Sequence, residues 1–317
     1  MIIITGGAGF IGSNLVRHLW EDEDIVVVDN FENGKKLLNI GNIPIVDLID
    51  KKQFLKELNK TRFKDCDYLI HLGAASATTE WNGKYLIENN YKYSKILLEW
   101  CIERNINFIY ASSASVYGLG KNGFCVEKNI EDPINAYAYS KFLFDEYVKR
   151  IIRNNNKIQI SGLRFFNVYG PYEEHKKEMS SPIHKFYKQL IDSKKIKLFK
   201  SYGGFESGNH KRDFISVFDC IEVIKWIISN KSVSGIFNCG TGKAATFKEV
   251  AEIIIEIIGY GEIEYIDFPE KLKNAYQSFT CADMDPLKNL GLNHKFSNIN
   301  YGIKKIFDIC DSNLKYK

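Results

Sequence analysis

The sequence lacks the features that mark several classes of protein. No apolar run reaches the roughly 18 residues that a membrane-spanning helix needs, and basic residues exceed acidic ones by only four, 43 against 39. These charges are interspersed, so neither a basic stripe for nucleic acid nor a patch for a membrane surface stands out. The small basic excess suits an anionic small molecule better than a macromolecule.

Clustered cysteines, internal repeats and low-complexity segments are missing as well. The seven cysteines are odd in number, and the closest pair, Cys220 and Cys239, lies 19 positions apart. Such spacing suggests neither a disulfide framework nor a metal site, so we expect reduced, mostly buried thiols. An apolar run directly after Met1 leaves no room for a signal peptide, which predicts a cytoplasmic protein. The 317 residues, 45% of them hydrophobic, predict one large and one small lobe.

The strongest local pattern occupies the first twenty residues. An apolar run, Ile2 to Ile4, leads into Gly6, Gly9 and Gly12, and a helical pattern follows from Phe10 to Trp20. Backbone without side chains lets a pyrophosphate approach closely, and the N–H groups at the start of the next helix favour its charge. The arrangement predicts a dinucleotide-binding turn.

A second buried strand pattern ends at Asp29, about 20 positions beyond the glycines, where a ribose hydroxyl is usually held. An acid there favours NAD, because it repels the 2′-phosphate of NADP. Asn30, Lys35 and Lys36 follow at once, however, and could offer donors and positive charge to that phosphate. The residues by themselves leave NAD against NADP open.

Further alternation of strand and helix patterns predicts an α/β fold with a doubly wound parallel Rossmann sheet. We expect strands at 43–46, 68–75, 107–112 and 158–167, and helices at 51–58, 83–104 and 137–151. Asp47, after the first of these strands, is a candidate adenine contact, and His71 is expected to be a satisfied strand residue. The helix 83–104 has an apolar stripe that includes Tyr85 and Ile96, and Asn89 and Asn90 interrupt it where a cofactor could lie.

The pattern changes after Gly170-Pro171. A charged segment is followed by a helix at 183–191, a strand at 196–199 and a glycine-rich loop at 203–208. Rossmann-like pieces return at 212–230 and 235–240, before a helix at 247–258, a strand at 262–268 and a terminal helix at 299–310. We expect a Rossmann domain over 1–170, to which the chain returns at about 213–240 and 282–314, and a smaller discontinuous α/β substrate lobe over 171–281.

Tyr137 and Lys141 are four residues apart and so share one face of a helix. A nearby ammonium lowers the pKa of a phenol, which would make Tyr137 a usable base, and Lys141 can also reach a nicotinamide ribose. Ser113 stands at the carboxyl end of a strand, on the ligand side of such a sheet. Together these residues predict a hydride-transfer site.

Several segments carry a family resemblance. The chain resembles extended short-chain dehydrogenase/reductase enzymes at 5–12, 112–118, 137–141 and 164–171. It resembles the ADP-L-glycero-D-manno-heptose 6-epimerase family within that superfamily at 78–85, 139–147, 175–176, 211–214 and 268–277. The second set is not general to the superfamily and carries most of the weight for this family.

The resemblance implies an NADP-dependent isomerase that inverts C6 of ADP-glycero-manno-heptose. The carbinol would be oxidised to a transient ketone and reduced again on the other face, which supplies ADP-L-glycero-D-manno-heptose for lipopolysaccharide core synthesis. It also implies a homo-oligomer, such as a pentamer, with no nucleic-acid or membrane partner.

The same resemblance implies roles for individual residues. Tyr137 and Lys176 would be the two acids and bases, assisted by Lys141 and Ser113. Besides Gly6, Gly9 and Gly12, the cofactor would contact Phe10, Ile11, Asp29, Asn30, Lys36, Lys51, Leu72, Gly73, Ala74, Ala75, Ser76, Asn89, Lys141, Val168 and Lys176. The substrate would contact Asn167, Glu178, Lys185, Phe199, Lys200, Ser201, Tyr202, Arg212 and Tyr276.

Three of these positions need comment. Arg212 suits a diphosphate because its planar guanidinium pairs with phosphate oxygens. Glu178 departs from the small residue usual in the family, and the loop 203–209 is longer than usual. Whether His184 or Lys185 contacts the substrate stays open.

Alternative interpretations remain. Without the resemblance, Lys176 would be read as part of a solvated charged turn. A UDP-hexose 4-epimerase shares the serine motif, and a noncatalytic NAD(P)-sensing regulator could use the same fold. A sugar 4,6-dehydratase is disfavoured, because no carboxylate stands beside Ser113.

Overall fold

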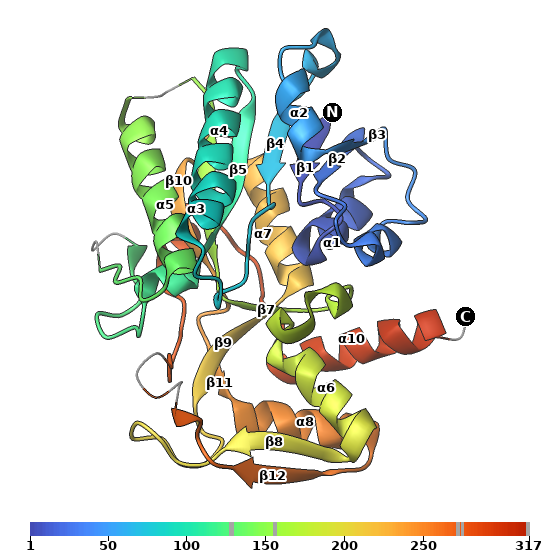
Figure 1. Cartoon of the computed structure of the whole chain (residues 1–317), viewed down its shortest axis with the longest axis vertical. Helices are drawn as coiled ribbons and strands as arrows, with labels where there is room; N and C mark the ends of the chain where they lie inside the picture. The colour runs from blue at the N-terminus through green and yellow to red at the C-terminus, as the bar shows by residue number, and fades with distance from the viewer. Residues whose placement is uncertain (127–129, 155–156, 271–272, 274–275, 315–317) are drawn as a thin grey trace. The chain divides into compact units, whose positions relative to one another are not determined.

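The computed structural model describes residues 1–126, 130–154, 157–270, 273 and 276–314, with side chains up to residue 309. Contacts divide the chain into two compact units (Figure 1). Unit 1 comprises Met1–Val116, Asn135–Arg164 and Ile221–Phe237. Unit 2 comprises Tyr117–Ile134, Phe165–Cys220 and Asn238–Lys317.

Unit 1 is built on a seven-stranded sheet in the order β10-β6-β5-β4-β1-β2-β3. The pairings from β3 through β5 are parallel. The order reverses direction between β1 and β4, which is the switch point where ligands bind in doubly wound sheets. The Rossmann prediction is therefore confirmed. The strands are β1 (Ile2–Thr5), β2 (Ile25–Asp29), β3 (Asp47–Asp50), β4 (Tyr68–His71), β5 (Asn107–Ser113), β6 (Ile160–Phe165) and β10 (Gly235–Cys239).

The helices of unit 1 begin with α1 (Phe10–Leu19) after the glycine-rich turn and α2 (Lys51–Glu57) after β3. Both α4 (Tyr93–Arg104) and α5 (Ala136–Asn154) pack against β5 (Figure 1). The central strands β1 and β2 are buried at every position and apolar up to their last residues, Thr5 and Asp29, as expected where helices cover both faces of a parallel sheet. Shorter helical segments are η1 (Gly34–Asn39), η2 (Thr61–Phe63), α3 (Gly83–Leu86) and η4 (Ala114–Tyr117), and α7 (Val217–Ser229) lies mostly in this unit.

The expected helix 83–104 is continuous but contains a π-helical segment, η3 (Ile87–Lys92), which holds Asn89 and Asn90. A π turn inserts an extra residue, so the helical phase differs on its two sides. The predicted apolar stripe is accordingly wrong at two positions, because Tyr85 and Ile96 are 41% and 42% exposed.

The third strand also differs from the prediction. It spans Asp47–Asp50, paired with Val26 to Asp29, whereas residues 43–46 form a turn that contains Pro44, which has no N–H to donate. Asp47 therefore stands at the start of β3, where it pairs with Arg62, and not at the ligand side. The carboxyl end belongs to Asp50, which caps α2 by accepting from Lys52 and Gln53.

Unit 2 contains a three-stranded sheet, β11-β9-β7, and a two-stranded sheet, β12-β8. The predicted strand 158–167 is divided, because Phe166 breaks it into β6 and β7, and β7 pairs with β9 in this second unit. The elements are β7 (Asn167–Tyr169), η6 (Glu174–Met179), α6 (Pro182–Ser193), β8 (Lys195–Phe199), β9 (Lys211–Ser216), β11 (Ala244–Thr246), α8 (Phe247–Ile258), β12 (Glu262–Ile266), α9 (Asp285–Asn289) and α10 (Ile299–Leu314).

One apolar core joins three helices of unit 2. Leu190 of α6, Ile254 of α8, and Ile303 and Phe307 of α10 belong to it. This packing groups α10 with unit 2, whereas the sequence pattern suggested that residues 282–314 return to the first domain. The predicted terminal helix itself is confirmed by backbone, although the side chain of Cys310 lies outside the described residues.

The part of the chain that the structure describes contains no helix long and apolar enough to cross a bilayer, and no group of three or more metal-ligating side chains. Six cysteines fall in this part with side chains, and all are free. Cys66, Cys101, Cys220 and Cys239 are buried, as free cysteines usually are.

Candidate active site

The glycine-rich turn between β1 and α1 has no room for side chains. Gly6 has a φ of +69°, and a Cβ there would lie 2.6 Å from the Cα of Gly73, on the segment after β4. A Cβ on Gly12 would lie 2.1 Å from the carbonyl oxygen of Gly6. These two glycines therefore let the backbone fold tightly at the start of α1, where its N–H groups can face a phosphate.

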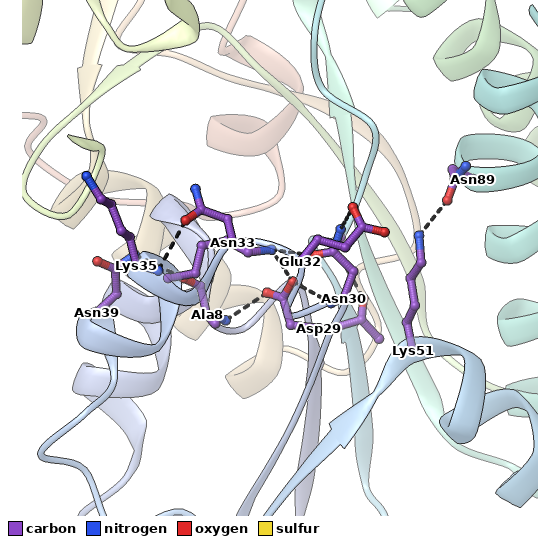
Figure 2. Close-up of polar contacts among 12 residues, drawn as sticks. Ala8, Asp29, Asn30, Glu32, Asn33, Lys35, Asn39, Lys51 and Asn89 are labelled. Atoms are coloured by element: carbon purple, nitrogen blue, oxygen red, sulfur yellow. Dashed lines mark hydrogen bonds and ion pairs between the residues drawn. The ribbon is translucent and has the colours of Figure 1, made fainter. Parts of the chain in front are cut away.

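Asp29, at the end of β2, is 6% exposed and fully engaged by neighbours. Its Oδ2 accepts from the N–H of Ala8 in the glycine-rich turn at 3.1 Å, and its Oδ1 accepts from the N–H of Asn30 at 2.8 Å. Lys36 forms an ion pair with the same carboxylate and donates to Oδ1 of Asn30 at 2.6 Å. Figure 2 shows Asp29 between Ala8 and Asn30. The negative charge that would repel a 2′-phosphate is thus compensated within the protein.

Two asparagines of the π-helical segment η3 form hydrogen bonds to other elements of unit 1. Asn89 accepts from Nζ of Lys51 at 2.6 Å, as Figure 2 shows. Asn90, the next residue, is buried and bonds both backbone groups of Ala75, at 2.8 and 3.0 Å, and Oγ of Ser140 at 2.9 Å. The segment 72–76, expected to contact the cofactor, is thereby fixed to α5.

His71 is a satisfied residue of β4, as predicted. Its Nδ1 lies 2.6 Å from Oγ1 of Thr5, and its Nε2 lies 2.7 Å from Oγ of Ser94. Burial, with a smaller effect from Lys141, lowers its pKa to about 3. The imidazole is therefore neutral at physiological pH and holds β1, β4 and α4 together.

Tyr137, Lys141 and Ser113 come together in unit 1. Tyr137 and Lys141 lie one turn apart at the start of α5 and are 8% and 4% exposed. Burial raises the pKa of Tyr137, and a hydrogen bond from Ser113 opposes that rise. The expectation that Lys141 lowers the pKa of Tyr137 is not met, because the Lys141 ammonium donates to the carbonyl of Ala111 at 2.8 Å. Burial lowers the pKa of Lys141 to about 8.

Asp145 supports Lys141 and was missed by the sequence analysis. It lies one turn further along α5, and its charge raises the pKa of Lys141 against the effect of burial. Its carboxylate accepts from Tyr110, Ser112 and Arg164 at 2.8 to 2.9 Å, all inside the core. The available signal was its spacing of four residues from Lys141, which places both on one face.

Lys176 lies in unit 2, on the 3₁₀ segment η6 between β7 and α6, and is partly buried. Burial lowers the pKa of its amine, and Glu173 opposes that effect. It is thus not the fully solvated lysine of an ordinary charged turn. Glu178 is exposed on the same segment, and Lys185 and His184 both stand on the first turn of α6. Asn167 and Val168 lie on β7.

Four of the expected substrate residues gather in one aromatic cluster of unit 2. The guanidinium of Arg212 lies 5.1 Å from the ring centre of Tyr276, whose ring packs edge-on against Phe199. Tyr202 stacks on Phe268 with ring centres 4.1 Å apart. Burial lowers the pKa of Arg212. Burial also raises the pKa of Tyr276, and the charge of Arg212 opposes that rise.

The remaining expected residues of this region lie outside the cluster. Lys200 and Ser201 are exposed, and Lys200 pairs with Asp267. His210, which the sequence analysis did not select, stacks on Phe205 of the long loop, and its Nε2 donates to the carbonyl of Tyr202 at 3.1 Å. Within the segment 268–277, residues 271, 272, 274 and 275 lie outside the described residues.

This arrangement of a glycine-rich turn, a Tyr-Ser-Lys group and a strand order reversing beside β1 agrees with comparisons to known proteins. Residues 2–240 match the model of the NAD dependent epimerase/dehydratase family. The chain belongs to this family. Family membership makes it an epimerase-type enzyme with a nicotinamide dinucleotide as cofactor.

The similarity to individual proteins covers almost the whole chain. An ADP-L-glycero-D-manno-heptose-6-epimerase of Alkalilimnicola ehrlichii is 46% identical over 311 residues, 97% of each protein. The crystal structure of the Helicobacter pylori ADP-L-glycero-D-manno-heptose-6-epimerase is 32% identical, with a TM-score of 0.83 over 98% of this chain and 96% of that one. A UDP-N-acetylglucosamine 4-epimerase of Methanobrevibacter ruminantium is 25% identical, with a TM-score of 0.85 over 98% of each chain.

Proposed function

We propose that the protein inverts C6 of ADP-glycero-manno-heptose by transient oxidation to a ketone, using NADP, and so supplies ADP-L-glycero-D-manno-heptose for lipopolysaccharide core synthesis. The observation that carries this proposal is the group of buried Tyr137 and Lys141 with Ser113 on the ligand side of the sheet. The Alkalilimnicola and Helicobacter proteins, which carry that activity in their names, support the choice of substrate.

The residues of unit 1 fit a nicotinamide dinucleotide. The turn at Gly6 and Gly12 offers the side-chain-free backbone that a pyrophosphate requires. The ion pair of Lys36 with Asp29 supports NADP over NAD, because it neutralises the acid that would repel a 2′-phosphate. Lys51 and Asn89 would complete the cofactor site from α2 and η3.

The chemistry needs a hydride acceptor and proton transfer on two faces of the carbinol carbon. When bound, the nicotinamide supplies the hydride exchange. Tyr137 takes the proton from the C6 hydroxyl as hydride leaves, and Ser113 orients both the hydroxyl and Tyr137. Lys141 would hold the cofactor ribose, and Ser113 is the group that favours the ionised form of Tyr137. Lys176 is the second acid and base, acting on the face that Tyr137 does not reach.

Unit 2 would hold the ADP-heptose. Arg212 is buried among aromatic rings and suits the diphosphate, since a desolvated guanidinium pairs strongly with phosphate oxygens. Phe199, Tyr202 and Tyr276 offer flat apolar surface for the base and sugar. Asn167, Glu178, Lys200, Ser201 and either His184 or Lys185 complete the proposed contacts. The family resemblance further suggests a cytoplasmic homo-oligomer such as a pentamer.

A UDP-hexose 4-epimerase is the second candidate, favoured by the fold likeness to the Methanobrevibacter enzyme. A noncatalytic NAD(P) sensor is disfavoured, because it has no use for the hydrogen bond between Ser113 and Tyr137. The test is direct. Purified protein is given ADP-D-glycero-D-manno-heptose, UDP-glucose or UDP-N-acetylglucosamine, and the epimers are separated by chromatography. We expect turnover of the ADP-heptose alone; turnover confined to a UDP-sugar contradicts the proposal.

The cofactor can be tested without substrate. Nucleotide released from the purified protein by denaturation is identified by mass spectrometry. We expect NADP or NADPH, because a cofactor that is regenerated within each turnover need not dissociate from the protein. NAD alone would contradict the choice of cofactor while leaving the epimerase proposal in place.

A further inference from the structure

The segment 171–180, which links β7 to α6 and carries Lys176, has an unfavourable backbone course. Tyr172 and Lys177 have φ angles of 71° and 49°, in the left-handed region that residues with side chains seldom adopt. Lys177 combines this φ with a ψ of −118°, which interrupts η6. Such conformations persist only where the surrounding structure imposes them, and they gather at functional segments.

Glu173 imposes this course. Its side chain is 1% exposed, and its carboxylate accepts from the N–H of Ser181 at 2.5 Å and from Oγ of Ser181 at 2.7 Å. The same carboxylate accepts a longer contact from the N–H of Gly170 at 3.5 Å. Gly170 and Ser181 stand at the two ends of the segment, so a single carboxylate holds both ends. Ser181 also caps α6, because its Oγ accepts from the N–H of His184.

Glu173 is linked to Lys176 as well. The N–H of Lys176 donates to the carbonyl of Glu173 at 2.9 Å. The Glu173 carboxylate raises the pKa of the Lys176 amine, which burial and Lys185 lower. In the other direction, burial raises the pKa of Glu173, and the contacts with Ser181 and the charges of His184 and Lys176 oppose that rise. Within the described residues, Lys185 therefore acts on Lys176, and His184 acts on Glu173.

We propose that Glu173 is the positioning residue for Lys176: by holding both ends of the segment 171–180, its carboxylate fixes the place of the Lys176 amine and balances its charge. This inference rests on the proposed epimerase function, in which Lys176 is the second acid and base. Glu173 itself contacts neither substrate nor cofactor in this account.

The main variant is Glu173→Gln, which keeps the size of the side chain but loses its charge and one acceptor oxygen. Asp219→Asn is the matched control, because Asp219 is also a buried carboxylate of unit 2 that accepts from a serine N–H and from a histidine, Ser297 and His294. For Glu173→Gln we expect kcat for C6 epimerisation to fall roughly tenfold or more with KM nearly unchanged. Both variants should lose thermal stability to a similar degree, but Asp219→Asn should keep kcat within about twofold of the parent.

The pH profile separates a positioning role from a merely structural one. The limb of the kcat profile whose midpoint matches that of acylation of the Lys176 amine belongs to Lys176. Removing the negative charge of Glu173 removes the group that raises the pKa of Lys176, so this limb should move to lower pH in Glu173→Gln. A limb at the parental pH, with kcat falling equally in Glu173→Gln and Asp219→Asn, overturns the inference.

Two further measurements keep the test decisive. Ser181→Ala weakens the hold but keeps the charge, so kcat should fall while the limb stays in place; if Glu173→Gln fails to fold, an unchanged kcat in Ser181→Ala overturns the inference. The acylation rate of the Lys176 amine against pH, read by peptide mass spectrometry, needs no substrate. Its midpoint should fall in Glu173→Gln and stay constant in Asp219→Asn. A parent protein inactive on ADP-heptose would defeat the proposed function but leave this labelling comparison intact.

Discussion

Lys36 forms an ion pair with Asp29 at the end of β2, in the position where a nicotinamide cofactor presents its adenosine ribose. Replacing Lys36 with glutamate would put two acids together and remove the only cation that touches Asp29 within the described residues. We expect Lys36→Glu to weaken NADP binding relative to NAD by roughly tenfold or more, measured by isothermal titration calorimetry on cofactor-stripped protein.

Lys35→Glu is the matched control for this change. Lys35 lies on the same 3₁₀ turn, η1, but its side chain is exposed, so the same charge reversal should alter the ratio of the two affinities by no more than about threefold. Equal effects of the two variants would mean that the preference comes from the general field of the surface and not from the pair with Asp29.

Tyr137→Phe removes one hydroxyl and keeps the buried ring. Because general acid and base groups typically contribute about 10²–10⁴-fold, we expect the epimerisation rate to fall within that range. Retained nucleotide and thermal stability should match the parent, since the ring fills the same space. A variant that stays within about tenfold of the parental rate would exclude Tyr137 as the base.

Lys176→Met should abolish interconversion of the two C6 epimers and yet leave Tyr137 able to act on one of them. The measurement uses an analogue with an aldehyde at C6, which can be dismuted, and records which stereoisomers are oxidised and reduced. Lys177→Met, its exposed neighbour, is the control and should behave as the parent. Interconversion at the parental rate in Lys176→Met would exclude Lys176 as the second acid and base.

The parts of this site that local pattern determines were predictable. The turn at Gly6 and Gly12 and the pairing of Tyr137 with Lys141 on one helix face depend on residues within a few positions of each other. The partners of Asp145 were not predictable, because Asp145 lies on α5 whereas Tyr110 and Arg164 lie on the strands β5 and β6. The π segment was visible only as an interruption at Asn89 and Asn90, and its effect on the helical phase needed coordinates.

The errors share a physical cause. Residues 43–46 have strand-like composition, but Pro44 has no donor and the amides of Ile43 and Ile45 bond locally. Hydrogen bonding to β2 therefore begins only at Val46, whose N–H donates to the carbonyl of Ile25. The sequence suggested one strand over 158–167, yet Asn167 at its end belongs to the sheet of another unit. A run of hydrophobic residues records burial and does not say in which core it is buried.

Asp145→Asn should destabilise unit 1 strongly. Asp145 and Arg164 form an ion pair with both side chains fully buried, and removing one partner of such a pair typically costs about 3–5 kcal/mol. The exposed pair of Lys288 and Asp285 provides a contrast, since Asp285→Asn should cost at most about 1 kcal/mol. Denaturant unfolding of both variants measures the difference, and similar losses would contradict the role of burial.

His71 should make the folded state sensitive to mild acid. Its folded pKa, about 3, lies below the ordinary value of 6.5, so the unfolded chain takes up a proton that the native protein refuses. The stability from neutral His71 is complete above pH 6.5 and is lost as the pH falls towards 3, amounting to about 2 kcal/mol between pH 7 and pH 5.

The check for His71 is the slope of unfolding free energy against pH over this range. His71→Gln, which can still bond Thr5 or Ser94, should be less stable at pH 7 but should lose that part of the slope. An unchanged slope in His71→Gln would assign the acid sensitivity to other groups.

The place of α10 has a consequence for the order in which the protein forms during synthesis. Unit 1 has all its strands once residue 237 has left the ribosome, so it can fold early. Unit 2 begins at residue 117 but lacks Ile303 and Phe307, which fill the core between α6 and α8, until much later. For that interval its apolar surfaces stay uncovered, which makes this half of the nascent chain the one most in need of a chaperone.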